Sequence, residues 1–354
     1  MATQATHQMS SERILRTKQL EIVGELSANH NGSLARALEL VSAASKTGVD
    51  AIKLQTYTPD TITLASDLEA FKVSKNHELW GGRSLYDLYL EAHTPWEWHE
   101  PIFSLAQSLG LEVFSSPFDE TAVDFLESLG VKRYKIASLE IVDLPLIAKV
   151  AATGKPIILS TGASTLQEVG LAVNTAREVN PLIDITLLLC TSSYPASPNS
   201  IGLSNMKILG RKFDAAVGFS DHTIGIGVSV AAAALGASMI EKHITLDESS
   251  NGPDASFSAS VTELALLVKS AHEAAAAVKE REFGPHRSEH ESLRLRPSLW
   301  VTANVKKGDL VSEHNVRSLR PSGGLPPSEL KKLIGQTFSR DVSRATPMSH
   351  QLHS

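Results

Sequence analysis

Lys53 and Lys135 are charged residues inside stretches that otherwise have the composition of buried strands. Lys53 lies in "AIKLQTY" and Lys135 lies in "RYKIAS". A buried ammonium group costs free energy unless an anion or a carboxylate lies beside it. We therefore expect both side chains to reach one site, where two ammonium groups suit a ligand that carries a phosphate and a carboxylate.

His222 and His243 follow two further apolar runs, "AAVGFS" and "SMIEK". Adjacent strands lie about 4.8 Å apart, so two such imidazoles can reach one ion. Two histidines, completed by water and substrate oxygens, suit a divalent metal with open coordination positions. Glu241 lies two residues before His243, on the same side of a strand, and we expect it to orient that ring.

Other polar side chains gather at the ends of the same apolar runs. A single serine or threonine at such a place is commonly a turn residue or a helix cap. Their convergence on one edge favours an anion site. Cys190 also ends an apolar run, and we interpret it as a small packed residue because no partner base is evident. The polar residues are Glu25, Ser27, Asn29, Asn31, Gln55, Ser115, Ser116, Ser138, Glu140, Ser160, Thr161 and Ser220.

The composition excludes several classes of protein. The 354 residues are 42% hydrophobic and 20% charged, with a net charge of −6 and one cysteine. A single cysteine excludes an internal disulfide framework and fits a reducing compartment. Without long basic runs we expect no nucleic-acid partner, and without a run of about 20 apolar residues we expect no membrane span. The polar start "MATQATHQMSSER" does not resemble a signal peptide, so we expect a cytoplasmic protein.

The chemically interesting residues must be positioned by alternating strands and helices. Helical patterns at 33–47, 119–129, 143–153, 165–179 and 224–237 separate short apolar runs. This alternation favours a (β/α)8 barrel, whose functional residues gather at the C-terminal ends of the strands. A doubly wound open sheet is the alternative, but no G-x-G-x-x-G follows the first strand. The expected strands are 21–26, 51–57, 111–117, 133–138, 156–161, 184–190, 215–220 and 238–244.

Two segments depart from this alternation. Residues 58–96 separate the second strand from its helix, and we expect them to form a lid or a wall of the site. The barrel domain is expected to cover residues 1–280, and the charged residues 281–297 have the character of a linker. Residues 298–354 then form a small β-rich module, which at about 60 residues is near the lower limit for folding alone and should pack on another surface.

The motifs together resemble those of the sialic acid synthases. The matching stretches are "GELSANHNGS", "AIKLQTYTPDTIT", "FSSPFD", "YKIASLE", "LSTGAS", "SDHTIG", "EKHIT" and "GPDASFS". The tail "VKKGDLVSEHNVRSLRP" resembles an antifreeze-like (SAF) domain of the β-clip type. Within the family, "KLQTYTPDTIT", "LYDLYLEAHTPWEW" and "SSPFD" are most similar to the pseudaminic acid synthases.

The resemblance implies a reaction and assigns roles to residues. Phosphoenolpyruvate would condense with an N-acetylated amino sugar and water, releasing phosphate by C–O cleavage. For a pseudaminic acid synthase the sugar is 2,4-diacetamido-2,4,6-trideoxy-altrose; an N-acetylneuraminate or a legionaminic acid synthase is the alternative. Phosphoenolpyruvate contacts are implied for Lys53, Ser116, Lys135, Ser138, Ser160 and Ser220. Positions near the sugar are Glu25, Gln55, Glu140, Tyr194 and Asp254.

The resemblance also implies a metal and a partner subunit. His222 and His243 match metal ligands, usually for Mn²⁺ or Mg²⁺, and Glu25 and Glu140 are the candidates for moving protons. Family members are domain-swapped homodimers, and Arg320 matches an arginine that reaches the sugar site of the neighbouring subunit. Here "RPSGGLPP" replaces the usual Arg-Pro-Gly, so the reach of Arg320 stays open.

Two rival functions remain at this point. One is a different phosphoenolpyruvate-dependent aldol synthase that acts on an aldose phosphate; it would need further cationic residues, which the strand ends do not clearly offer. The other is a carbohydrate-binding protein without catalysis. The set of residues that suits catalysis argues against it, namely Lys53, Lys135, His222, His243 and Glu25.

Overall fold

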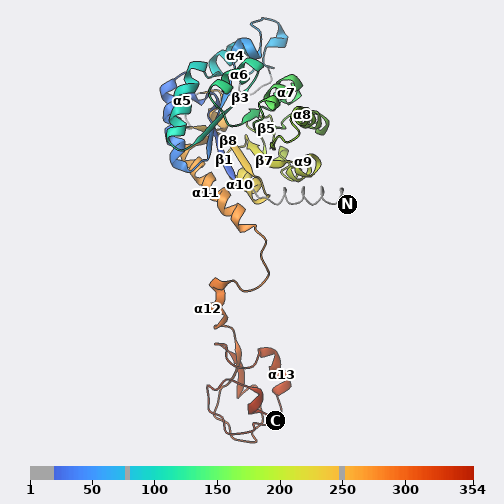
Figure 1. The fold of residues 1–354 in the computed structure, drawn as a ribbon. Coiled ribbons are helices and arrows are strands. Elements are labelled where there is room, and N and C mark those ends of the chain that lie inside the picture. Colours follow the sequence, from blue (N-terminus) through green and yellow to red (C-terminus); the bar gives the residue numbers. More distant parts are fainter. Residues whose placement is uncertain (1–19, 76–79, 247–251) are drawn as a thin grey trace, which may run out of the picture. The chain divides into compact units, whose positions relative to one another are not determined.

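Strands β1 to β8 form a closed parallel barrel in the computed structural model, which describes residues 20–75, 80–246 and 252–354 (Figure 1). Each strand pairs with the next one along the chain, and β1 also pairs with β8. The barrel is therefore confirmed and the open sheet is excluded. The strands are β1 (Glu21–Glu25), β2 (Ala51–Thr56), β3 (Glu112–Pro117), β4 (Tyr134–Ile136), β5 (Ile157–Ser160), β6 (Ile185–Cys190), β7 (Ala216–Asp221) and β8 (Met239–Thr245).

Helices follow each strand and surround the barrel (Figure 1). Polar caps begin several of them; Thr165, for example, accepts a hydrogen bond from Glu168 N at the start of α8. A glycine ends the first helical segment, where Gly48 has a φ of 87°. The helices are α2 (Leu34–Ala44), α5 (Trp96–Ser108), α6 (Glu120–Ser128), α7 (Leu144–Ala152), α8 (Leu166–Val179), α9 (Asn205–Phe213), α10 (Gly227–Ala234) and α11 (Val261–Ala277).

The connection between β2 and α5 is longer than the others and carries two short helices, α3 (Pro59–Ile62) and α4 (Leu85–Ala92). The ring of Tyr89 on α4 packs edge-on against Tyr57, which follows β2, with centroids 5.6 Å apart. The insertion is thereby attached to the end of a barrel strand. Within the described residues, every helix is too short or too polar to cross a membrane.

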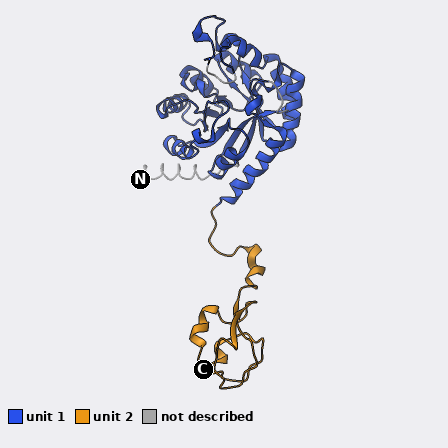
Figure 2. Ribbon diagram, turned by 180° about the vertical axis from the view of Figure 1, so that it is seen from behind, with its two compact units in different colours: residues 1–279 blue, residues 280–354 orange. Residues whose placement is uncertain are grey.

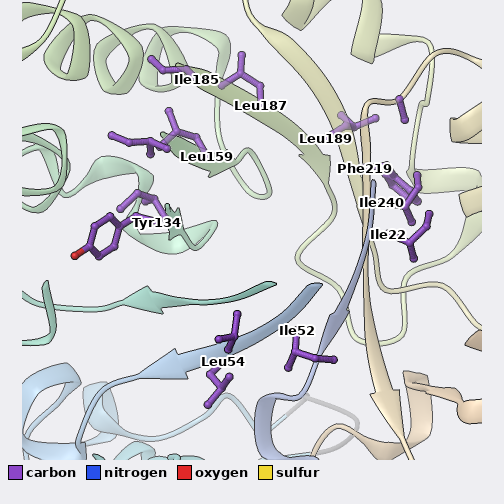
Figure 3. Close-up of a cluster of buried hydrophobic side chains, with 14 of the residues drawn as sticks. Ile22, Ile52, Leu54, Tyr134, Leu159, Ile185, Leu187, Leu189, Phe219 and Ile240 are labelled. Carbon is purple, nitrogen blue, oxygen red and sulfur yellow. The ribbon is translucent and has the colours of Figure 1, made fainter. Parts of the chain in front are cut away.

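Alternation along the strands separates two apolar clusters. Outward side chains such as Ile52 and Leu54 on β2 pack under the helices, where Figure 3 shows them among neighbouring buried residues. Inward side chains such as Ala51 on β2 and Phe114 on β3 fill the interior of the barrel. The inward row on β2 therefore runs from Ala51 to Lys53, so the alternation itself directs the lysine to the inside.

The chain divides into two compact units, the first ending at Lys279 and the second covering Glu280–Ser354 (Figure 2). The second unit contains the antiparallel pair β10 (Ser298–Val301) and β11 (Val316–Leu319), with the short helices α12 (His290–Leu293) and α13 (Leu330–Leu333). Its own core includes Leu299, Val316 and Phe338. The segment 281–297, read as a linker from sequence, contains α12.

Candidate active site

Four charged residues meet inside the barrel at the C-terminal ends of its strands. Glu25 ends β1, Lys53 lies on β2, Lys135 on β4 and Glu241 on β8. Each residue is at most 4% exposed. Because they share the inward parity of their strands, residues far apart in sequence, such as Lys53 and Glu241, contact one another. The predicted meeting of the two lysines is therefore confirmed in geometry.

Glu241 lies between the two ammonium groups. Its Oε1 is 3.3 Å from Lys135 Nζ, and its Oε2 is 3.8 Å from Lys53 Nζ. Glu25 forms a second ion pair with Lys53. The expectation that Glu241 orients His243 was wrong, because its carboxylate contacts the lysines and the Ser220 hydroxyl instead, with Ser220 donating to Oε1 at 2.9 Å.

The two carboxylates ionise differently. Burial opposes the charge on Glu241, but the nearby Lys135 and Lys53 ammonium groups lower its pKa to about 2. Burial raises the pKa of Glu25 to about 7, even though Lys53 opposes the shift. Protonation of Glu25 removes negative charge from beside Lys53, which favours the entry of an anion.

The predicted hydroxyls that lie at the site differ in their hydrogen-bond partners. Ser116 lies 3.4 Å from Lys53 Nζ and Ser220 contacts Glu241, so both belong to the charged cluster. Ser160 at the end of β5 is buried, and its Oγ makes no hydrogen bond within the described structure. Such an orphaned hydroxyl suits a ligand oxygen.

Two other hydroxyls were expected at the site and lie elsewhere. Ser115 is on the outward side of β3, where its Oγ is 2.6 Å from Thr56 Oγ1. Thr161 donates from Oγ1 to the Leu188 carbonyl oxygen at 3.1 Å. Both are structural, because strand alternation turns Ser115 toward the helices and the backbone of β6 satisfies Thr161.

Gly162 allows the ends of β4, β5 and β6 to approach closely. Its N–H donates to Ser138 Oγ at 3.2 Å. A Cβ at this position would lie 2.4 Å from Ser192 Oγ and 2.7 Å from Ser138 Oγ. The glycine therefore leaves room for two hydroxyls next to the unpaired Ser160, which is a site for a ligand that accepts several hydrogen bonds.

His222 and His243 lie side by side, with ring centroids 5.3 Å apart. His222 Nδ1 is 3.1 Å from the Thr191 carbonyl oxygen, so it carries the proton and leaves Nε2 with a free lone pair. Burial lowers the pKa of His243 well below its usual value, which keeps this imidazole neutral. Burial opposes a charge on His222, but Cys190 and the Thr191 carbonyl oxygen outweigh burial and raise its pKa. Two adjacent imidazoles fit a divalent ion, which binds His222 after it loses its extra proton. The described residues contain no group of three or more His, Cys, Asp or Glu side chains that could hold a metal ion.

Cys190 has a histidine beside it that sequence reasoning missed. Its Sγ lies 3.7 Å from His222 Nδ1. Burial alone would raise the pKa of this thiol, but His222, with smaller contributions from Ser138 and Lys135, outweighs burial and the pKa is lowered. The packed cysteine of the sequence interpretation is thus also an electrostatic neighbour of the histidine pair.

An aromatic wall lines the histidine side of the site. Tyr194 packs on His222 with centroids 4.4 Å apart, and Phe257 packs on His243 at 5.0 Å. Trp80, from the insertion between β2 and α5, reaches Tyr194 with a centroid distance of 6.0 Å. The insertion was expected to form a lid or a wall of the site, and this contact with Tyr194 agrees with a wall.

The remaining predicted residues surround this centre or lie apart from it. Asp254 Oδ2 is 3.7 Å from His243 Nδ1 and accepts a hydrogen bond from Ala28 N. Glu140 is half-buried in the 3-10 helix Leu139–Val142, and burial raises its pKa to about 7. Gln55 is half-buried on the same parity as Lys53. Arg320 is an exposed residue of the second unit.

Comparison with known proteins identifies the family of this barrel. The chain belongs to the NeuB family, which matches residues 40–282, and a SAF domain matches residues 296–349. The SAF match covers the core of the second unit. The sequence interpretation of a synthase barrel followed by an antifreeze-like domain is therefore confirmed.

Individual members of the family show which synthases this chain is similar to. The chain is 44% identical to the pseudaminic acid synthase of Helicobacter pylori over 93% of this chain and 96% of that protein. It is 39% identical to the N,N'-diacetyllegionaminic acid synthase of Legionella pneumophila over 92% of each. The crystal structure of N-acetylneuraminic acid synthetase from Leptospira borgpetersenii, in complex with citrate, superposes with a TM-score of 0.68 at 30% identity, over 78% of this chain and 91% of that one.

The role of Glu241 as a counter-charge for the two lysines can be tested without a substrate. Glu241→Gln should lower the free energy of unfolding by about 3–5 kcal/mol, because it leaves two buried ammonium groups with one fewer counter-charge. Inorganic phosphate should then stabilise the variant more than the wild type, since the anion replaces the lost charge. Urea unfolding with and without phosphate measures both effects. Glu69→Gln removes an exposed ion pair with Lys72 and should cost at most about 1 kcal/mol; equal losses in the two variants would contradict this account.

Proposed function

We propose that this chain condenses phosphoenolpyruvate with 2,4-diacetamido-2,4,6-trideoxy-altrose and water to give pseudaminic acid and phosphate. The observation that carries the proposal is the pair of buried ammonium groups on Lys53 and Lys135, together with the adjacent imidazoles of His222 and His243. The two ammonium groups suit the anionic phosphoenolpyruvate, and the two imidazoles suit the polar sugar acceptor. The high identity to a pseudaminic acid synthase supports the choice of sugar.

Phosphoenolpyruvate binds against the lysines and the strand-end hydroxyls. Lys53 and Lys135 hold its phosphate and carboxylate, and the unpaired Ser160 hydroxyl and Ser116 contribute hydrogen bonds. Ser138 and Ser220 complete this cradle. Fixed donors around a buried anion need no reorganisation as charge shifts during the reaction, which is the main source of acceleration in such sites.

His222 and His243 would hold a divalent ion, Mn²⁺ or Mg²⁺, and His222 would use Nε2 for this. A divalent ion bound there supplies Lewis-acid chemistry that makes the aldehyde carbon of the open-chain sugar electrophilic. The Thr191 carbonyl fixes the His222 tautomer, and Asp254 lies beside His243. Tyr194 and Phe257 exclude water from this side of the site.

The bond changes in this reaction balance without a redox partner. Carbon 3 of phosphoenolpyruvate attacks the aldehyde carbon, and the aldehyde oxygen takes up a proton. Water adds at carbon 2 and loses one proton, which leaves a hydroxyl there. This hydroxyl loses its own proton and becomes the ketone oxygen as the bond between carbon 2 and the bridging oxygen breaks, and the electron pair of that bond leaves with the phosphate. Glu25 and Glu140 are the groups that take and return these protons, because burial raises the pKa of each to about 7, near the working pH.

The reaction is tested by supplying phosphoenolpyruvate with a panel of amino sugars and identifying products by mass. The altrose derivative should give the highest kcat/KM, and the nearest competitor is the sugar that leads to legionaminic acid, favoured by the Legionella pneumophila relative. With ¹⁸O in the bridging position of phosphoenolpyruvate, the label should leave in phosphate. Label retained in the nine-carbon acid would reject C–O cleavage, and no phosphate release with any sugar would reject the proposed reaction.

Removal of one proposed metal ligand should lower the activity, whereas removal of an exposed histidine should not. His222→Ala should lower kcat/KM by more than about 100-fold, because even residues that only support metal ligands contribute 10–100-fold. A chelator should inhibit the wild type, with added Mn²⁺ restoring activity, and should have no further effect on the variant. His290→Ala replaces an exposed histidine and should leave activity unchanged. Full activity of His222→Ala in the presence of a chelator would refute the metal role.

The active unit is a homodimer in the cytoplasm, in which the SAF domain of one chain completes the site of the other. The second unit has its own small core and carries Arg320 in an exposed position, which supports a role at another surface. Arg320 then reaches the sugar site of the neighbouring subunit. The one cysteine, Cys190, is a free thiol, which supports a reducing location.

Mixing two inactive chains tests this sharing of sites. Arg320→Ala and His222→Ala should each be nearly inactive alone. Co-refolded in equal amounts, they should recover about a quarter of the wild-type activity, because half of the dimers are mixed and each of those has one intact site. An Arg320→Ala chain with normal sugar KM, or a mixture without recovery, would contradict the exchange of SAF domains.

A further inference from the structure

A second ion pair lies directly behind the histidines, on the opposite face of the same two strands. Asp221 Oδ2 accepts a hydrogen bond from Lys242 Nζ at 3.1 Å, and the two residues are 0% and 1% exposed. Asp221 precedes His222, and Lys242 precedes His243. Because side chains alternate along a strand, the pair faces helix α10 while the neighbours Ser220 and Glu241 face the interior.

The pair holds the backbone on both sides of His222. Asp221 Oδ1 accepts from Thr223 N at 2.8 Å and from Thr223 Oγ1 at 2.7 Å, and Oδ2 also accepts from Ser229 Oγ on α10 at 2.5 Å. Lys242 Nζ donates a further hydrogen bond to the Thr223 carbonyl oxygen at 2.7 Å. Both backbone groups of Thr223 are thus bound to the ion pair.

The register of the strands extends this restraint to His243. Asp221 and Lys242 are Cα partners in the β7–β8 ladder, so the ion pair fixes the rung just before the two histidines. A shift of one residue between these strands would move every side chain to the wrong face. The same ion pair therefore sets the position of His222 in its loop and its height relative to His243.

A purely stabilising role does not explain why these charges are here. Removing two charges from water is expensive, and well-packed apolar residues in place of a buried ion pair are often equally stable or more stable. Leu54 and Ile52 occupy outward positions on β2 and pack without any charge. At the corresponding face of β7 and β8 the chain uses a network that an apolar pair could not reproduce, because it binds the Thr223 backbone.

We propose that Asp221 and Lys242 are positioning residues that hold His222 and His243 at the separation needed for one divalent ion. They touch neither substrate nor ion and act through the backbone on which the two imidazoles are mounted. This inference rests on the metal site of the proposed function and adds to it the element that keeps the site formed before the ion binds.

The test is the affinity of the full-length chain for Mn²⁺ alone. After treatment with a chelator and its removal, Mn²⁺ is titrated and the free ion is followed by electron paramagnetic resonance. Asp221→Asn combined with Lys242→Met removes both charges and so leaves no unpaired buried ion. We expect its Kd for Mn²⁺ to rise about 10–100-fold, the range found for groups that orient metal ligands, while circular dichroism shows a folded chain.

A matched pair at the other end of the barrel provides the control. Arg133 pairs with Glu21 at the start of β1, far along the strand from the histidines. Glu21→Gln combined with Arg133→Met should lower Tm but leave the Kd for Mn²⁺ within about twofold of the wild type. If the control weakens Mn²⁺ binding as much as the Asp221 and Lys242 double variant at a similar Tm, the effect is general destabilisation and the positioning role is refuted.

Two further variants separate the possible failures. His222→Ala should abolish tight Mn²⁺ binding; if it binds Mn²⁺ like the wild type, the metal proposal fails and this inference fails with it. If only His222→Ala loses the ion, while the double variant keeps wild-type affinity, the metal site stands and the positioning role is refuted. Thr223→Val removes one hydrogen bond from Asp221 and offers the same comparison should the double variant not fold, with a rise in Kd of about threefold expected.

Discussion

Glu241 brings the ammonium groups of Lys53 and Lys135 within 3.8 and 3.3 Å of its carboxylate oxygens, inside a barrel whose deeper inward positions are apolar. Without this carboxylate, Glu25, which pairs with Lys53, would be left to balance the charge of two buried ammonium groups. The neutralisation keeps the site stable without a ligand. It also leaves a positively biased pocket, since an arriving anion competes with Glu241 for ammonium groups that are already oriented.

The alternation of side chains along the strands assigns the two faces of the barrel wall to different tasks. On β8, Glu241 and His243 face the site, while Lys242 between them faces α10 and contributes to the ion pair with Asp221. On β2, Lys53 faces the site, while Ile52 and Leu54 belong to the apolar core under the helices. Chemistry and support are thus interleaved residue by residue in one short segment of chain.

The fold and much of the site could be predicted from the sequence. The period of the apolar runs indicates the barrel, and the cost of burying a lysine indicates that Lys53 and Lys135 converge. Partners across the barrel could not be predicted, because they depend on which strands face each other. Hence Glu241 was paired with the wrong residue, Ser115 was placed at the mouth although it bonds to Thr56, and the histidine beside Cys190 was missed. Parity along β3 would have indicated the outward position of Ser115.

The long connection between β2 and α5 has a consequence for how this kind of enzyme can diversify. A deletion of one residue in β8 would exchange the faces of Glu241 and Lys242 and destroy both networks at once. The described residues between Tyr57 and Trp96 lie outside the barrel ladder, so the length and composition of this connection can change while the catalytic strands stay in place. Trp80, from the same connection, reaches Tyr194. Substitutions that change the preference for the sugar acceptor can therefore accumulate in this connection without disturbing the strand register.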